Sequence, residues 1–191
     1  MPLDLRRRDQ VERFATQILE RRPDILVNNV GLNVKGTTET FTDDDYDTLL
    51  DVNLRAPFAL IRAALPAMKD RGWGRVVNIT SLWSISGNCL DAAYCASKFG
   101  LDGLTASLAA EVASSGILAN CVAPGFVLTE AAQEAYSPQD LESIGAQIPV
   151  GRLGKPEEIA SLVSWLVSEQ NTYLTGQNIL IDGGLTRTAK P

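Results

Sequence analysis

The sequence predicts a single α/β domain in which helices cover both faces of a parallel sheet, a doubly wound architecture. Short, continuous apolar runs such as Ile25–Val27 and Val76–Ile79 are typical of strands buried on both faces. Longer stretches with helical periodicity separate these runs, which is the alternation expected of crossover connections. Because residues 1–191 show no internal repeat and no interdomain linker, one domain is expected.

The first half of the chain contains two predicted helices and one predicted strand. Apolar residues at helical spacing predict a helix over 8–21, with Asp9 near its start and Pro23 just after its end. The strand 25–27 follows and runs into Asn28-Asn29-Val30-Gly31. Thr42 and the three aspartates after it form a cap and an acidic first turn, so a long helix is expected from 42 to about 69.

Pro57 interrupts that long helix. Proline has no amide hydrogen, so the Asn53 carbonyl lacks the donor that would normally lie four residues later. We therefore expect a helix kink and a free carbonyl at this point. A kink made only for packing is the alternative.

The second half continues the same alternation. We expect strands at 76–79, 118–122 and 178–181, and helices at 91–114 and 156–169. A Pro-Gly loop follows the middle strand, and a polar region occupies 129–149.

Composition excludes several classes of function. The chain has 17 basic and 23 acidic residues, so no basic surface for nucleic acid is expected. The four arginines near the first helix lie among acids, which favours a solvated helix face over an anion site: Arg6, Arg7, Arg8 and Arg13. With no histidine, a Ser-His-Asp triad and histidine-bearing metal sites are excluded, and no metal site is expected.

The sequence also predicts a cytoplasmic location. No apolar run approaches the roughly 18 residues of a membrane span, so no membrane partner is expected. The first residues lack the apolar core of a signal peptide. The three cysteines lack zinc-site spacing and suit reduced thiols.

Six motifs, in this order and spacing, resemble the short-chain dehydrogenase/reductase family, especially its 3-oxoacyl-carrier-protein reductase and sugar-dehydrogenase branches. The motifs are Asn28-Asn29-Val30-Gly31, Asp51-Val52-Asn53, Asn78-Ile79-Thr80-Ser81, Tyr94-Cys95-Ala96-Ser97-Lys98, Pro124-Gly125-Phe126-Val127-Leu128-Thr129 and Ile181-Asp182-Gly183-Gly184. The resemblance covers essentially the whole chain. It implies a Rossmann-like sheet and an oxidoreductase that transfers hydride between NAD(P)(H) and a carbonyl or alcohol.

The candidate catalytic residues are Asn53, Ser81, Tyr94 and Lys98. Tyr94 and Lys98 are four residues apart and share a helix face, where an ammonium favours the phenolate over the phenol. A chance pair on an amphipathic helix is the alternative, but Ser81 ends a strand at the edge of the sheet where ligands bind. In the family, Ser, Tyr and Lys act on the substrate oxygen, and the asparagine carbonyl holds a water in a proton relay.

The resemblance also implies a cofactor site. Asn29, Val30 and Gly31 would line the adenosine ribose, where Val30 replaces the usual alanine and is bulkier. Pro124, Gly125, Val127 and Thr129 would approach the nicotinamide. Gly125 can equally be a turn glycine.

The glycine-rich loop that receives the pyrophosphate in the family is missing from this sequence. The resemblance implies an N-terminally truncated fold without the first three strands and two helices, roughly 50–60 residues of βαβ structure. Binding of NAD(P)(H) is therefore in question, and the residue that selects NAD or NADP is not present. Strand 25–28 would be an open edge that the first helix, a rearranged segment or another subunit should cover.

Three hypotheses account for the missing loop. In the first, the sequence is a truncated version of a full-length reductase whose start was misplaced. In the second, it is a natural short form that uses the Ser-Tyr-Lys site for cofactor-independent dehydration, isomerisation or retro-aldol chemistry. In the third, it is a non-catalytic subunit that pairs with a complete reductase. A dimer or tetramer is expected by resemblance. The acidic chain favours a small hydroxy or keto substrate over a long acyl carrier.

Overall fold

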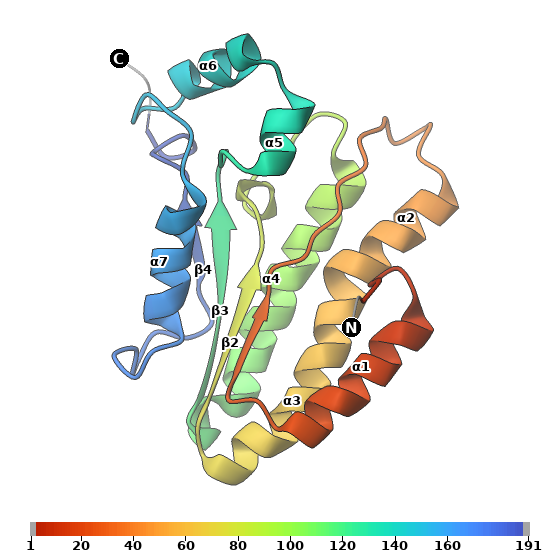
Figure 1. The fold of residues 1–191 in the computed structure, drawn as a ribbon, viewed down its shortest axis with the longest axis vertical. Coiled ribbons are helices and arrows are strands. Elements are labelled where there is room, and N and C mark those ends of the chain that lie inside the picture. Colours follow the sequence, from red (N-terminus) through yellow and green to blue (C-terminus); the bar gives the residue numbers. More distant parts are fainter. Residues whose placement is uncertain (1–2, 189–191) are drawn as a thin grey trace.

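The computed structural model describes residues 3–188 and contains one four-stranded, parallel sheet. The strands lie in the order β1-β2-β3-β4 (Figure 1). Their bounds are β1 (Ile25–Asn28), β2 (Gly74–Ile79), β3 (Ile117–Pro124) and β4 (Asn178–Ile181). The predicted fold class, a parallel α/β sheet with helices on both faces, is confirmed.

Seven α-helices connect and cover these strands in the described part of the chain. They are α1 (Arg8–Arg21), α2 (Asp43–Leu50), α3 (Ala56–Arg71), α4 (Ala92–Val112), α5 (Glu130–Ala135), α6 (Pro138–Gln147) and α7 (Pro156–Leu166). The polar region expected at 129–149 therefore contains two short helices. Each begins at a side-chain cap, since Thr129 accepts from the Ala132 amide and Ser137 from the Asp140 amide.

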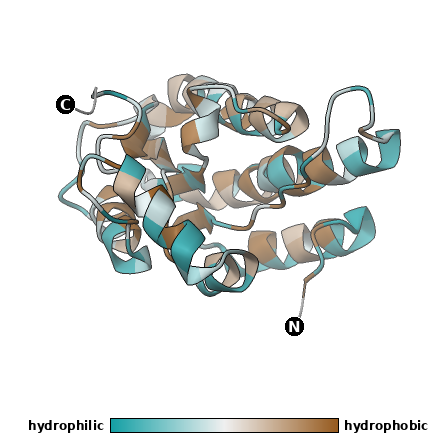
Figure 2. Cartoon of the chain, turned by 90° about the horizontal axis from the view of Figure 1, so that it is seen from above, coloured by the Kyte–Doolittle hydropathy of each residue, from teal (hydrophilic) through white to brown (hydrophobic). Residues whose placement is uncertain are grey.

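Alternating residues of the strands build two cores. Val76 packs into a cluster with α1, α3 and α4, whereas the next residue, Val77, packs with Val122 and Leu166 beneath α7. Helices α1, α3 and α4 thus lie on one face of the sheet and α7 on the other (Figure 1). Figure 2 shows hydrophobic residues gathered where the helices face the sheet and hydrophilic residues on the outer surfaces.

Strand β1 is the open edge that the sequence predicts. It pairs with β2 alone among residues 3–188, and Ile25 and Val27 are 42% and 40% exposed. Helix α1 packs against α3 through Val11 and Ile18 and covers the edge only in part. An apolar groove of about 380 Å³ remains between α1 and β1.

The long helix predicted over 42–69 is interrupted. A π-helical turn, η1 (Asp51–Arg55), separates α2 from α3, and the Ala56 amide donates to the Asp51 carbonyl five residues earlier. Pro57 follows directly and has no amide to give Asn53. The predicted interruption is therefore confirmed at this place, and it takes the form of a π turn.

The arginines near α1 are exposed and paired with carboxylates. Arg6 pairs with Asp4, and Arg7 and Arg13 pair with Asp9. Arg8 instead reaches Asp51 in η1, a tertiary contact that the sequence did not reveal. No helix in the described part of the chain is both long and apolar enough to cross a membrane.

Candidate active site

A cleft of about 640 Å³ opens at the carboxyl ends of β2 and β3, the edge of a parallel sheet where ligands bind. Its walls contain seven of the eleven predicted site residues: Asn29, Ser81, Tyr94, Pro124, Gly125, Val127 and Thr129. Helix α7 supplies another wall through Ile159 and Val163, which sequence reasoning did not assign to the site.

Ser81 and Tyr94 meet in this cleft. Ser81 follows β2 and caps a short 3-10 turn, η2 (Leu82–Ser84), while Tyr94 lies in the first turn of α4. Burial raises the pKa of the Tyr94 phenol, a hydrogen bond with Ser81 lowers it, and the nearby Asp91 and Cys95 raise it. The net direction is upward, so the free site holds Tyr94 as a protonated phenol.

Lys98 lies behind Tyr94 and is only 3% exposed. Its Nζ donates to the Ile79 carbonyl at 2.9 Å and lies 5.7 Å from the centre of the Tyr94 ring. Burial lowers the pKa of Lys98 from 10.5 to about 8. Burial is the largest effect on the pKa of both groups, so in the free site the pKa of Tyr94 is raised although an ammonium nearby favours the phenolate.

Asn53 is fully buried and holds the backbone after β1. Its Oδ1 accepts from the Leu32 amide at 2.8 Å, and its Nδ2 donates to the Leu32 carbonyl at 2.8 Å and to the Ser97 hydroxyl at 3.0 Å. These bonds tie η1 to α4 and to the segment that carries Gly31. The predicted role of Asn53 concerned its carbonyl, whereas the contacts described here belong to its side chain.

The three residues predicted to line the ribose lie in different places. Asn29 lines the cleft, whereas Val30 is 59% exposed and lies on the groove beside α1. Gly31 lies against Lys98, since a Cβ at this position would come within 3.2 Å of the Lys98 Nζ. Only glycine or a small displacement of Lys98 suits this approach.

Gly125 is required by a close approach rather than by a left-handed turn. A Cβ at Gly125 would lie 2.7 Å from the Asp182 Cβ and 2.8 Å from its Cα. The loop after β3 therefore packs directly on the end of β4, which positions Val127 and Thr129 in the cleft.

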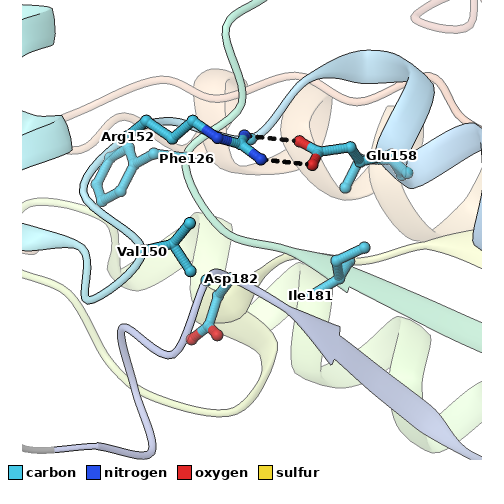
Figure 3. A pocket seen from close by; sticks show the side chains of 9 residues that line it. Phe126, Val150, Arg152, Glu158, Ile181 and Asp182 are labelled. Atoms are coloured by element: carbon cyan, nitrogen blue, oxygen red, sulfur yellow. Dashed lines mark hydrogen bonds and ion pairs between the residues drawn. The ribbon is translucent and has the colours of Figure 1, made fainter.

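The same loop is held from behind by the segment before α7. Gly154 exchanges hydrogen bonds with Phe126 and Leu128, each 2.9 Å long. Arg152 binds the Glu158 carboxylate through both terminal nitrogens, at 2.9 and 2.7 Å (Figure 3). A second cavity of about 180 Å³ lies here, lined by apolar groups, this ion pair and Asp182.

The residues present fit the nicotinamide half of a dinucleotide. The cleft has room beside Tyr94, and Pro124, Gly125, Val127 and Thr129 line it. Neither β1 nor any other described strand leads into a glycine-rich helix start that would receive a pyrophosphate. No cluster of three or more metal-binding side chains occurs among residues 3–188.

Sequence reasoning missed a layer of buried polar contacts beneath the cleft. The Asn28 amide donates to Asn78 at 2.7 Å, and Asn78 donates to the Thr105 hydroxyl at 2.8 Å. Asp91, directly before α4, accepts from Asn33 and Asn88. Asn28 and Asn78 lie within two of the six motifs, but nothing in the sequence indicated these partners.

Comparison with known proteins identifies the family. The sequence profile described as enoyl-(acyl carrier protein) reductase matches residues 1–186. The chain belongs to this family of short-chain dehydrogenases/reductases. It is an oxidoreductase of the NAD(P)-dependent type, as the motifs predicted.

Curated relatives include reductases of acyl thioesters. The chain is 44% identical over 173 residues to the 3-oxoacyl-[acyl-carrier-protein] reductase FabG of Rickettsia felis, covering 90% of this chain and 71% of the relative. It is 41% identical over 162 residues to the acetoacetyl-CoA reductase of Cupriavidus necator, covering 85% of this chain and 65% of the relative.

Solved structures share the fold over nearly the whole chain. A gluconate 5-dehydrogenase from Burkholderia cenocepacia, in complex with NADP and tartrate, is 31% identical with a TM-score of 0.89. The chain covers 98% of its own length and 74% of that protein's. A putative gluconate 5-dehydrogenase from Beutenbergia cavernae is 35% identical with a TM-score of 0.91, and the match covers 97% of this chain and 75% of that protein.

Proposed function

We propose that the chain interconverts a small hydroxy compound and its keto form, with Ser81, Tyr94, Lys98 and Asn53 as the working residues. The observation that carries this proposal is the meeting of Ser81 and Tyr94 in one cleft with Lys98 buried directly behind them. A bound nicotinamide cofactor supplies or accepts the hydride.

The protein's own groups handle the substrate oxygen and its proton. The Ser81 hydroxyl holds the oxygen, and Tyr94, kept as a phenol by its raised pKa, donates a proton to it during carbonyl reduction. With a pKa of about 8, Lys98 is mostly an ammonium at neutral pH, and its positive charge favours the phenolate that the transfer leaves behind. Asn53 fixes the Leu32 backbone and hence the segment that contacts Lys98.

The cofactor assignment rests on the relatives and on the cleft. Two solved relatives contain NADP. Asn29, Pro124, Gly125, Val127 and Thr129 line the cleft here. Val30 lies on the groove beside α1, and Gly31 lies against Lys98.

Charge favours a small substrate over a phosphate-bearing acyl carrier. The segment 127–151, which leaves the cleft, contains four acidic residues and no Lys or Arg: Glu130, Glu134, Asp140 and Glu142. A surface of one sign repels anions of the same sign. A small uncharged keto compound should therefore turn over with a lower KM than acetoacetyl-CoA.

We further propose that the chain forms a homo-oligomer and is located in the cytoplasm. Phe58 on α3 and Phe99 on α4 are 48% and 46% exposed, which supports an apolar contact with a second copy. The three free cysteines support a reducing compartment. Sedimentation showing only monomer at micromolar concentration would refute the oligomer.

Calorimetric titration with NADH and then NADPH tests the function first. We expect saturable binding, followed by turnover of a small ketone that Tyr94→Phe abolishes. Tyr173→Phe, at a residue that is 95% exposed, is the matched control and should retain activity. Absence of binding at millimolar cofactor would remove hydride transfer from this chain alone, and Tyr94-dependent dehydration or retro-aldol activity would then be assayed without cofactor.

A further inference from the structure

Asp91 is a buried carboxylate that the proposed reaction does not use. It occupies the cap position of α4, three residues before Tyr94, and is 2% exposed. A carboxylate at this position usually accepts bonds from the first amides of the helix, but Asp91 makes no such side-chain bond. None of the ion pairs among residues 3–188 includes it.

Its two carboxylate oxygens instead bind side chains from two segments, one after β1 and one between Ser81 and Tyr94. Oδ1 accepts from the Asn33 side chain at 3.1 Å, in the segment after β1, and Oδ2 accepts from the Asn88 side chain at 2.5 Å, in the loop between Ser81 and Tyr94. Both asparagines are exposed, so the buried carboxylate lies beneath them. Hydrogen bonds to an ionised acceptor are among the stronger contacts in proteins.

A strained backbone next to Asp91 indicates that the connection between the loop before α4 and the segment after β1 is functional. Leu90, next to Asp91, has φ +65°, a left-handed conformation that is uncommon for a branched side chain. In this conformation the Leu90 carbonyl accepts from the Gly36 amide at 2.9 Å, a second bond between the same two segments. Strain of this kind persists where the surrounding contacts determine the backbone, and it is concentrated at functional sites.

The charge of Asp91 also acts on Tyr94. The groups that face the phenol are the Ser81 hydroxyl, the Lys98 ammonium, the Cys95 thiol and Asp91. Burial raises the pKa of Tyr94 most. Among the neighbouring groups that raise it, Asp91 has the largest effect, since a nearby negative charge disfavours a phenolate.

We propose that Asp91 is a positioning residue for Tyr94: its buried carboxylate joins the loop before α4 to the segment after β1 and thereby holds the first turn of α4, which carries the phenol. The proposal rests on the proposed function for its purpose, but the contacts and the charge effect exist without turnover. Two substitutions separate them. Asp91→Asn removes the charge, keeps the size and one acceptor oxygen, and replaces the other oxygen by an NH2 donor that the Asn88 side chain can pair with after its amide rotates. Asp91→Ala removes the charge and both acceptors.

The first test titrates the Tyr94 phenol by near-ultraviolet absorbance, taking each protein minus its own Tyr94→Phe form. Asp91→Asn should shift phenolate formation to lower pH and so give a larger phenolate fraction at a fixed pH below the transition, because the negative charge that disfavours the phenolate is removed. Glu111→Gln, which removes an exposed charge elsewhere on α4, should leave the titration unchanged. An Asp91→Asn curve that coincides with the wild-type curve would overturn the charge effect.

The second test measures hydrogen exchange at the Gly36 amide. Asp91→Ala should accelerate exchange at least tenfold, while Asp91→Asn stays near the wild-type rate. If Asp91→Ala does not fold, Asn33→Ala removes one of the same bonds from an exposed position and should accelerate exchange in the same direction. Unchanged exchange in the folded variant would contradict the positioning role. If the titration shift and the faster hydrogen exchange are both observed but no ketone is turned over, the positioning role stands and only the proposed function is refuted.

Discussion

Asn53 allows a quantitative test of how the site is held together. Replacement by alanine removes three hydrogen bonds and leaves the Leu32 amide and carbonyl without their partner, while the Ser97 hydroxyl keeps its bond to the Tyr94 carbonyl. Each unsatisfied, partly buried backbone group costs about 1–1.5 kcal/mol, so Asn53→Ala should lower the free energy of unfolding by about 2–3 kcal/mol.

Urea unfolding followed by circular dichroism measures this loss. For a chain of this size, the change corresponds to a decrease of roughly 4–12 °C in Tm. Gln133→Ala, which truncates an exposed amide in α5, should change the free energy of unfolding by less than about 0.5 kcal/mol. A loss below about 1 kcal/mol for Asn53→Ala would show that water satisfies Leu32 and that Asn53 does not fix this segment.

Three further predictions concern the same region. Gly125→Ala forces a Cβ to within 2.7 Å of the Asp182 Cβ, so it should destabilise the chain by about 1–3 kcal/mol and weaken NADPH binding, measured by urea unfolding and calorimetry. The pKa of Lys98 is lowered by burial from 10.5 to about 8, so the unfolded chain binds more protons between these values. Lys98 should therefore make stability rise with pH across that window, and Lys98→Met should lose this contribution; equal slopes in the two proteins would contradict it. Burial raises the pKa of Asp51, but bonds led by the one from Arg8 outweigh burial and the net pKa is lowered. This stabilisation is present above the unfolded value of 3.8 and is lost as pH falls. Asp51→Asn should therefore lower the free energy of unfolding at neutral pH by up to about 1 kcal/mol, the usual range for ion pairs with exposed partners, and should have no effect in strong acid. An equal cost at both pH values would refute the ionic origin.

The sequence by itself determined the fold class and most of the site. Continuous apolar strands such as 76–79 alternate with amphipathic helices, and this alternation permits only a parallel sheet with both faces covered. The residues that line the cleft were predictable because a strand end is visible in the sequence. Ser81 and Pro124 each follow or end a buried strand, and such ends meet at one edge of the sheet.

The tertiary structure alone decided where charges and amides point. Nothing in the sequence shows that Lys98 donates to the Ile79 carbonyl, that Val30 faces the groove beside α1, or that Asp91 joins Asn33 to Asn88. These contacts join residues from 3 to 58 positions apart. Local periodicity specifies which face a residue occupies, but the partner of a buried polar group depends on how distant segments pack, and burial then determines the pKa that the group adopts.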